Sequence, residues 1–449
     1  MQDFIKKKEQ GFIVAGMNSS NGKTIVMCLL MSALQKRNIS VQPFKVGPDY
    51  IDPGFHSHFS KKSSVNLDPW IMGRDHIVEA VEEFTQNTFG IVEGVMGLFD
   101  GSDPHSDEGS TMEVARWLHW PILLVVSCKN SGRSITAAIE GFISEGGGNA
   151  NFLGVILNQL NSESHCEYIK KACSTLKIPI LGVLPEIPDL VWPERYLGLQ
   201  PRIEQKLPDV SKLAQTAEKY LKIDILIDKF KSLSNSAEAE NIIFHSPSNY
   251  NKRIAVAIDE VFHFYYRANM EWLQKQGVEI IPFSPLRDSK VPENISAMIL
   301  GGGFPEIFAQ KISVNKPMLS SLRKTVESGI PTYAECGGLM ILAESINLKS
   351  GEILPMAGLV PGIFKMTNQL QHFGYCKVYL PNKGELRGHE FHYSKWSAEE
   401  SSANLWEVTR HSTGISRMEG FRSANLHASY VHLYFPQASS LIGEVLKIY

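Results

Sequence analysis

Short apolar runs alternate with amphipathic segments along the first half of the chain. The runs are apolar throughout rather than at every second position, which is typical of strands buried on both faces of a parallel sheet. Segments 24–37 and 134–144 lie between such runs, and their apolar positions have helical spacing. This order predicts βαβ units with helices on both faces of the sheet. The expected strands are 11–15, 41–45, 90–93, 122–126 and 154–157.

A second alternation follows a loose stretch at residues 229–252, where serine, asparagine and proline gather in turn-forming combinations. Its apolar runs are 253–258, 279–282, 297–300 and 331–334. We therefore expect an α/β protein of two domains. Residues 1–245 should form a doubly wound parallel sheet, and residues 246–449 a second α/β domain, with the boundary near residue 245.

Composition narrows the class of protein. The 449 residues exceed one ordinary domain, and 44 Lys and Arg nearly balance 47 Asp and Glu. Nucleic-acid-binding domains usually carry a strong basic excess, so we expect no nucleic-acid partner. No apolar run approaches the roughly 20 residues of a membrane helix, and the basic start does not continue as a signal peptide. Six scattered cysteines form no CxxC pair, so we expect a cytoplasmic protein with reduced thiols.

Residues 16–24, GMNSSNGKT, follow the first expected strand and open the first expected helix. This arrangement suits phosphate, because loop N–H groups and the helix N-terminus point at the anion. Gly22, Lys23 and Thr24 are the candidate nucleotide-binding residues, with the Thr24 hydroxyl available to Mg²⁺. Five residues separate the two glycines instead of the usual four, and an ordinary turn is the alternative.

Carboxylates follow two further expected strands. Asp49 and Asp52 lie in KVGPDYIDP after the second strand, and Glu93 ends the strand at 90–93. Ligands of open α/β sheets bind at the carboxyl ends of strands. Magnesium favours a few carboxylates together with phosphate oxygens and water, so Thr24, Asp52 and Glu93 are the candidate metal ligands. A solvated loop with an aspartate cap is the alternative for Asp49 and Asp52.

Cys336 lies in YAECGGLM, between an apolar strand and the start of an expected helix. A cysteine attacks an amide as its thiolate, which a helix N-terminus or a nearby histidine stabilises. Three glycines follow the strand at 297–300, and the amides of Gly302 and Gly303 could cradle an oxyanion. A buried structural cysteine and a tight glycine turn are the alternatives. Together the two motifs resemble class I glutamine amidotransferases.

The general base of such a site would be a histidine distant in the sequence. His432, in the apolar run ASYVHLYF near the C-terminus, is the candidate, and His427 is its rival. Many class I relatives have a glutamate two residues after this histidine, where this chain has Tyr434, so no third triad member is assigned. His389 and His392 in RGHEFHYS have a spacing that would allow metal binding, but contact with substrate carboxylates or a β-turn network is favoured.

The chain resembles the cobyrinic acid a,c-diamide synthase family in the motifs GKT, QPFKVGPDYIDP, NLDPW, VEGVMGLFDG, PERYLGL, AIDEVFHFYY, LGGGFPE, AECGGLM, RGHEFHYS and ASYVHLYF. The match spans nearly the whole chain in the expected order. It implies a dethiobiotin-synthetase-like phosphate-loop domain followed by a class I glutamine amidotransferase domain.

The resemblance also implies roles for residues. Lys23 and Thr24 would bind ATP phosphates and Mg²⁺. Asp49, Asp52 and Glu93 would organise Mg²⁺ and the carboxylate being activated. Asn158, at the end of the expected strand at 154–157, would read the adenine edge. Tyr196 stands where a histidine is expected in the PERYLGL motif.

The implied reaction is an ATP- and glutamine-dependent amidation of the a- and c-carboxylates of cobyrinic acid, in cobalamin biosynthesis. ATP would form an acyl phosphate, Cys336 would release ammonia from glutamine with His432 as base, and ammonia would pass between closely packed domains. The same chemistry on hydrogenobyrinic acid or nickel-sirohydrochlorin is an alternative. A phosphate-loop ATPase switch with a non-catalytic C-terminal binding domain is a remote one. The expected partners are small molecules, and a homodimer is left open.

Overall fold

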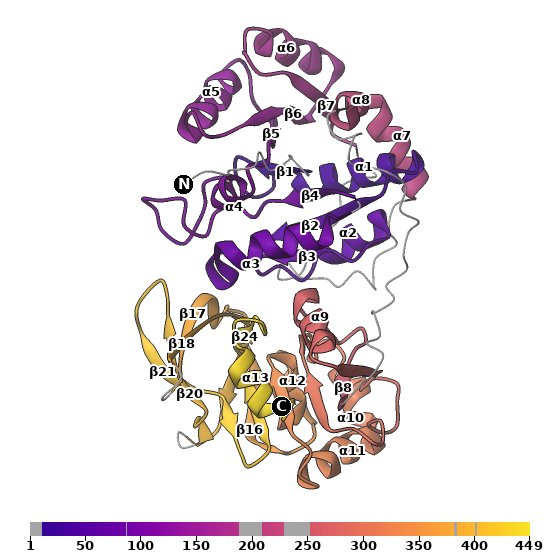
Figure 1. Cartoon of the computed structure of the whole chain (residues 1–449), viewed down its shortest axis with the longest axis vertical. Helices are drawn as coiled ribbons and strands as arrows, with labels where there is room; N and C mark the ends of the chain where they lie inside the picture. Colours follow the sequence, from indigo (N-terminus) through magenta and orange to yellow (C-terminus); the bar gives the residue numbers. More distant parts are fainter. Residues whose placement is uncertain (1–10, 87, 188–208, 229–251, 381–383, 400–401) are drawn as a thin grey trace. The chain divides into compact units, whose positions relative to one another are not determined.

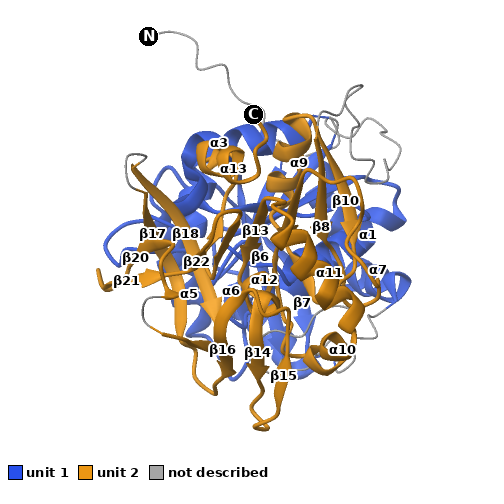
Figure 2. Ribbon diagram, turned by 90° about the horizontal axis from the view of Figure 1, so that it is seen from below, with its two compact units in different colours: residues 1–242 blue, residues 243–449 orange. Residues whose placement is uncertain are grey.

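A computed structural model describes residues 11–86, 88–187, 209–228, 252–380, 384–399 and 402–449 (Figure 1). The chain divides into two compact units, residues 1–242 and 243–449, which Figure 2 colours separately. The boundary expected near residue 245 and the departure at Tyr196 lie outside the described residues. No helix within the described ranges combines the length and apolar character that crossing a membrane requires.

Unit 1 contains a seven-stranded sheet with the order β3-β2-β4-β1-β5-β6-β7. Every neighbouring pair in it is parallel. The five expected strands are confirmed, while β3 and β7 were not expected. The strands are β1 (Gly11–Gly16), β2 (Val41–Val46), β3 (Val65–Leu67), β4 (Phe89–Glu93), β5 (Ile122–Ser127), β6 (Phe152–Leu160) and β7 (Ile180–Pro185).

Helices cover both faces of this sheet, as the apolar runs predicted (Figure 1). Every residue of β1, β2 and β4 is buried, which requires cover on both sides. One face shares a hydrophobic core with α1, α2, α7 and α8, and α3 packs on α4. The helices are α1 (Lys23–Lys36), α2 (Asp52–Ser60), α3 (Pro69–Phe84), α4 (Thr111–Leu118), α5 (Ile135–Gly146), α6 (Glu163–Cys173), α7 (Val210–Tyr220) and α8 (Ile223–Asp228).

Unit 2 is built on a six-stranded sheet with the order β10-β8-β11-β13-β23-β22. All neighbours are parallel except β22 and β23. The four runs expected from residue 253 onward are confirmed as β8, β10, β11 and β13. The strands are β8 (Lys252–Ala257), β10 (Val278–Phe283), β11 (Ala297–Leu300), β13 (Thr332–Glu335), β22 (Phe421–Arg422) and β23 (Leu426–Ser429).

Smaller sheets and helices complete unit 2, and the sequence analysis did not anticipate the sheets. They have the orders β12-β9, β15-β14-β16-β19 and β21-β20-β17-β18-β24. Their strands are β9 (Phe262–Phe264), β12 (Gly302–Gly303), β14 (Ala343–Asn347), β15 (Ile353–Pro355), β16 (Val360–Met366), β17 (His372–Leu380), β18 (Gly384–His392), β19 (Ser394–Ser397), β20 (Trp406–Arg410), β21 (Ser416–Glu419) and β24 (His432–Leu433). The helices are α9 (Arg267–Lys275), α10 (Ala309–Val314), α11 (Lys316–Glu327), α12 (Gly337–Leu342) and α13 (Ser439–Val445).

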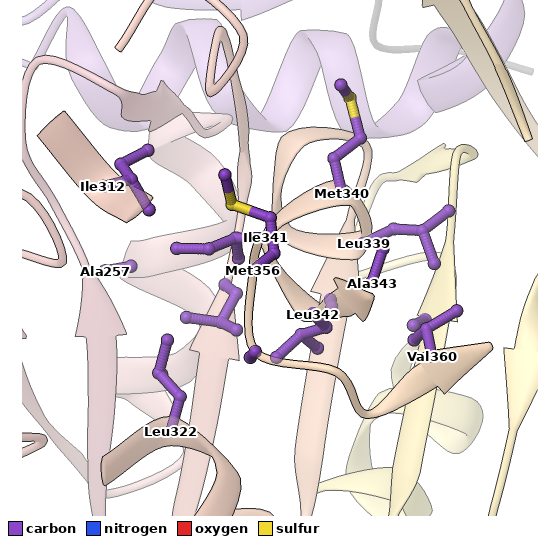
Figure 3. Packing of buried hydrophobic residues seen from close by; sticks show 14 of the residues in the cluster. Ala257, Ile312, Leu322, Leu339, Met340, Ile341, Leu342, Ala343, Met356 and Val360 are labelled. Atoms are coloured by element: carbon purple, nitrogen blue, oxygen red, sulfur yellow. The ribbon is translucent and has the colours of Figure 1, made fainter. Parts of the chain in front are cut away.

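Helix α12 begins directly after the candidate nucleophile, and its position depends on packing. All six of its residues are buried. Figure 3 shows Leu339, Ile341 and Leu342 packed among side chains from α10, α11 and β16, including Ile312 and Leu322. A six-residue helix is too short to be stable in water on its own. The hydrophobic core of unit 2 therefore fixes where the helix starts, and with it the backbone of the preceding cysteine.

Candidate active sites

The phosphate loop lies between β1 and α1 in unit 1. Gly22 adopts φ 85°, a left-handed conformation, and a Cβ there would stand 2.3 Å from Nδ2 of Asn158. The Lys23 ammonium donates to the carbonyl oxygens of Asn18 at 3.1 Å and Met96 at 2.5 Å. Burial lowers the pKa of Lys23 to about 8, and the neighbouring Lys45 adds to that effect. The sequence thus has glycine at position 22, where a side chain would clash. The Lys23 ammonium lies against a backbone oxygen of the loop.

The three candidate metal ligands belong to one cluster beside this loop, in which Lys45 joins Asp52 to Glu93. The Thr24 hydroxyl donates to Oε1 of Glu93 at 2.6 Å. Lys45 Nζ lies 3.2 Å from the same Glu93 oxygen and 2.8 Å from Oδ2 of Asp52. Hydroxyl and carboxylate oxygens are the donors that Mg²⁺ prefers, so this set fits that ion.

Asp49 lies at the edge of the same cluster. Its Oδ1 accepts the backbone N–H groups of Ile51 at 2.7 Å and Asp52 at 3.1 Å, at the start of α2. Its Oδ2 is 3.8 Å from Lys45 Nζ. Burial and the neighbouring Asp52 raise the pKa of Asp49 to about 6. The turn-capping role weighed as an alternative is therefore present, together with a place near the charged groups.

Two residues of this cluster were missed by the sequence analysis. Lys45 is 3% exposed and contacts three carboxylates. Burial lowers its pKa, but Asp52, Glu93 and Asp49 outweigh burial and raise it. His56 is fully buried, and its Nε2 lies 2.5 Å from Oε2 of Glu93. A lysine inside a strand expected to be buried on both faces was the signal available for Lys45, because a buried charge needs partners.

The Asn158 side chain lies beside the phosphate loop, as expected for a residue near the carboxyl end of a strand. Its Nδ2 donates to the backbone oxygen of Asn21 at 2.8 Å. This bond ties β6 to the loop just before Gly22. The adenine contact expected for Asn158 stays a prediction.

Cys336 forms the strand-to-helix elbow of unit 2. It joins β13 to α12 with φ 49° and ψ −103°, a conformation that costs a non-glycine residue roughly 1–3 kcal/mol. Its N–H donates to the Ser429 oxygen at 2.7 Å, and the Gly338 N–H donates to the Gly301 oxygen at 3.0 Å. A Cβ on Gly338 would stand 2.0 Å from the Leu300 oxygen. The strained cysteine is therefore held between two neighbouring strands.

The glycine run at 301–303 lies against this elbow. β12 pairs with β9, and a Cβ on Gly303 would stand 1.6 Å from the Val261 oxygen. A Cβ on Gly337 would lie 3.0 Å from the Gly303 nitrogen, and one on Gly302 would lie 2.4 Å from Cε1 of His432. The structure thus brings both candidate oxyanion glycines next to the candidate nucleophile and base.

His432 lies in β24, opposite His389 of β18, and is 2% exposed. Burial lowers its pKa, but the neighbouring Cys336 and Glu335 outweigh burial and raise it to about 10. The rival, His427, packs its ring against Tyr333 at 5.3 Å between centroids, and burial lowers its pKa to about 3. The geometry therefore favours His432 over His427 as the partner of Cys336.

His389 and His392 do not share a ligand site. They are three residues apart in β18, and such positions point to opposite faces of a strand. His389 stacks on His432 with ring centroids 4.8 Å apart, while His392 stacks on Tyr430 at 3.6 Å. Within the described part of the chain, no three His, Cys, Asp or Glu side chains are grouped for metal binding.

Glu335 is the residue of unit 2 that the sequence analysis missed. It ends β13 immediately before Cys336, and its Oε2 lies 3.4 Å from Nδ1 of His432. An acidic residue at the end of a buried strand, directly before the nucleophile, was the signal available in the sequence.

Comparison with known proteins agrees with both halves of this description. Residues 12–199 match the CobQ/CobB/MinD/ParA nucleotide binding domain, and residues 253–439 match the CobB/CobQ-like glutamine amidotransferase domain. A cobyrinate a,c-diamide synthase from Priestia megaterium is 37% identical, over 96% of this chain and 95% of the relative. Proteins of the same name are 36% identical in Listeria innocua and 38% identical in Picrophilus torridus, again over 96% of this chain and 98% and 96% of theirs.

These matches confirm the resemblance carried by the motifs and the α/β class of both units. The nucleotide-binding match contains the phosphate loop and its carboxylates, and the amidotransferase match contains Cys336, the glycine run and His432. With more than a third of positions identical over nearly the full length of these relatives, the chain belongs to the cobyrinate a,c-diamide synthase family of glutamine-dependent ligases.

Proposed function

We propose that this protein amidates the a- and c-carboxylates of cobyrinate, with glutamine as nitrogen donor and ATP as activating co-substrate. The observation that carries the proposal is the pairing of Cys336 with His432 beside Gly302 and Gly303, in a chain that also holds a phosphate loop. The first arrangement suits amide hydrolysis, and the second suits phosphoryl transfer. The family's relatives supply the identity of the acceptor.

The glutaminase half-reaction follows from the elbow. Cys336, as thiolate, attacks the side-chain amide carbon of glutamine, and the backbone amides of Gly302 and Gly303 stabilise the oxyanion that forms. His432 donates a proton to the departing nitrogen, so ammonia leaves and a thioester remains. His432 then takes a proton from water, which attacks the thioester. Glutamate is released and the thiolate is restored.

The synthetase half-reaction follows from the loop and its carboxylates. Loop amides and Lys23 bind the ATP phosphates, and Asn158 contacts the adenine. Thr24, Asp52 and Glu93 would hold Mg²⁺, which when bound neutralises charge on the phosphate oxygens. A substrate carboxylate oxygen attacks the γ-phosphorus and ADP leaves, which yields an acyl phosphate. Ammonia attacks the acyl carbon and phosphate leaves, so each amide consumes one ATP.

Lys45 and Asp49 support the activation step. Lys45 lies between Asp52 and Glu93 and forms an ion pair with each of them. Asp49 lies at the edge of the cluster and is placed to orient the incoming carboxylate. Excess ammonia supplied from solution would bypass the glutaminase site, because the acyl phosphate is formed in the other unit.

The test is mass spectrometry of cobyrinic acid after incubation with the protein, ATP, Mg²⁺ and glutamine. We expect two successive exchanges of a hydroxyl for an amino group. Parallel incubations with hydrogenobyrinic acid and nickel-sirohydrochlorin test the alternative acceptors. A Cys336→Ala variant should lose glutamine-dependent amidation and keep ammonia-dependent amidation. Unchanged glutamine hydrolysis in that variant would exclude Cys336 as nucleophile.

A further inference from the structure

We propose that Glu335 is the positioning residue of the glutaminase site, holding the His432 imidazole through Nδ1 from the strand that leads into the nucleophile. This inference rests on the proposed glutaminase function. It assigns the third member of the triad to the residue directly before Cys336, instead of to the position two residues after the histidine, which is Tyr434 in this chain.

The two side chains face each other in a buried setting. Glu335 Oε2 lies 3.4 Å from His432 Nδ1, and the residues are 5% and 2% exposed. A carboxylate beside an imidazole in a water-poor environment interacts with it more strongly than the same pair would at the surface. The pair is therefore placed to orient the ring and to stabilise its protonated form.

The carboxylate is itself held in place from two sides. Its Oε1 accepts the Tyr333 hydroxyl at 2.6 Å and the backbone N–H of Leu433 at 3.1 Å. Tyr333 is two residues earlier in β13, on the same face of the strand as Glu335. Leu433 directly follows His432. One oxygen is thus fixed by β13 and β24 together, and this leaves the other oxygen turned toward the imidazole.

A competing carboxylate lies nearby, and its contacts differ. Glu419 Oε2 accepts from Ser429 at 2.5 Å and Trp406 at 2.9 Å, and its Oε1 accepts from the Tyr430 N–H at 2.8 Å. Both oxygens of Glu419 therefore accept hydrogen bonds from buried groups of unit 2. Glu335 is the glutamate that has a carboxylate oxygen 3.4 Å from a ring nitrogen of His432.

The groups that face His432 come from several elements. Cys336 and Glu335 approach from the β13–α12 elbow, His389 of β18 stacks on the ring, and the Gly302 backbone lies against Cε1. Burial and the neighbouring His432 lower the pKa of His389, so His389 carries no charge. With Glu335 on Nδ1, the proton stays on that nitrogen and Nε2 is directed to the thiol.

The test compares Glu335→Gln with Glu419→Gln, the same substitution at another buried glutamate of the same unit. In Glu335→Gln we expect kcat/KM for glutamine hydrolysis to fall by at least about 10²-fold, with ammonia-dependent amidation retained. Glu335 stabilises charged His432, so the high-pH limb of the hydrolysis profile should move to lower pH in the variant. Glu335→Asp should recover part of the rate, while Glu419→Gln should leave the profile in place.

Several outcomes overturn the inference. A Glu335→Gln rate within about threefold of the parent with an unmoved pH profile would do so, and so would an equal loss in Glu419→Gln. If Glu335→Gln does not fold, ¹⁵N NMR of histidine-labelled parent protein decides, with His432→Gln used for assignment. A protonated Nδ1 on neutral His432 supports the inference, and an unprotonated Nδ1 refutes it. If the parent protein itself hydrolyses no glutamine, that result would refute the proposed glutaminase function, and not only the role of Glu335.

Discussion

A methyl group added at Gly302 should disable the glutaminase site without unfolding the protein. Gly302 is not in a left-handed conformation, so its backbone accepts alanine. The new Cβ would stand 2.4 Å from Cε1 of His432. Carbon atoms in contact prefer about 3.5 Å or more, so the imidazole must move by about 1 Å. A displacement of that size costs on the order of 10²-fold in rate, or about 2.7 kcal/mol of barrier.

The assay measures glutamine hydrolysis and ammonia-dependent amidation side by side in Gly302→Ala. Hydrolysis should fall by about 10²-fold through kcat, while ammonia-dependent amidation persists. Gly141→Ala is the control, because a Cβ at that exposed helical glycine meets nothing within 4 Å. Hydrolysis that stays within about threefold of the parent would refute the placement of His432 against Gly302. Equal loss of both activities would point to a folding defect and refute it as well.

Three further changes probe the two units. Lys45→Met leaves Asp52 and Glu93 without their shared cation, so the free energy of unfolding should fall by roughly 3–5 kcal/mol; an unchanged thermal unfolding midpoint would contradict this. The pKa of Lys23 is about 8, so its charge is lost as pH rises through that value and ATP affinity should fall above it; Lys23→Arg should flatten this dependence in calorimetric titrations. Gly338→Ala forces a Cβ to 2.0 Å from a backbone oxygen and should leave unit 2 unfolded by circular dichroism.

Many of the strands could be predicted from the distribution of apolar residues over short segments of the sequence. β1, β2 and β4 are buried along their whole length and lack a polar residue at every second position, because both faces of a parallel strand are covered. This signal needs no knowledge of partners. β17 and β18 escaped notice because their residues mix buried, half-buried and exposed positions without a regular alternation. β24 contains two residues, which is too short to carry any period.

The site residues that the sequence revealed also differ from those it did not reveal, according to whether their signal is local. Gly22 and the residues around Cys336 were recognisable because a turn and the helix that follows it are encoded in contiguous residues. Lys45 and His56 were missed because their importance depends on Glu93, which is 48 and 37 residues away from them. The spacing of His389 and His392 allowed metal binding without favouring it, and their placement in a strand puts them on opposite faces.

The sequence by itself indicated the candidate functional groups, which are a loop with Lys23 and Thr24 for phosphate and a thiol at Cys336 on a glycine turn. It also indicated the two α/β units that contain them. Tertiary structure decided which groups act together. Glu335 and Leu433 are 98 residues apart, and the pairing of β13 with β23, followed by β24, brings the glutamate to His432. Local propensity acts over a few residues, whereas such a contact exists only after distant strands have packed, and no local pattern encodes that register.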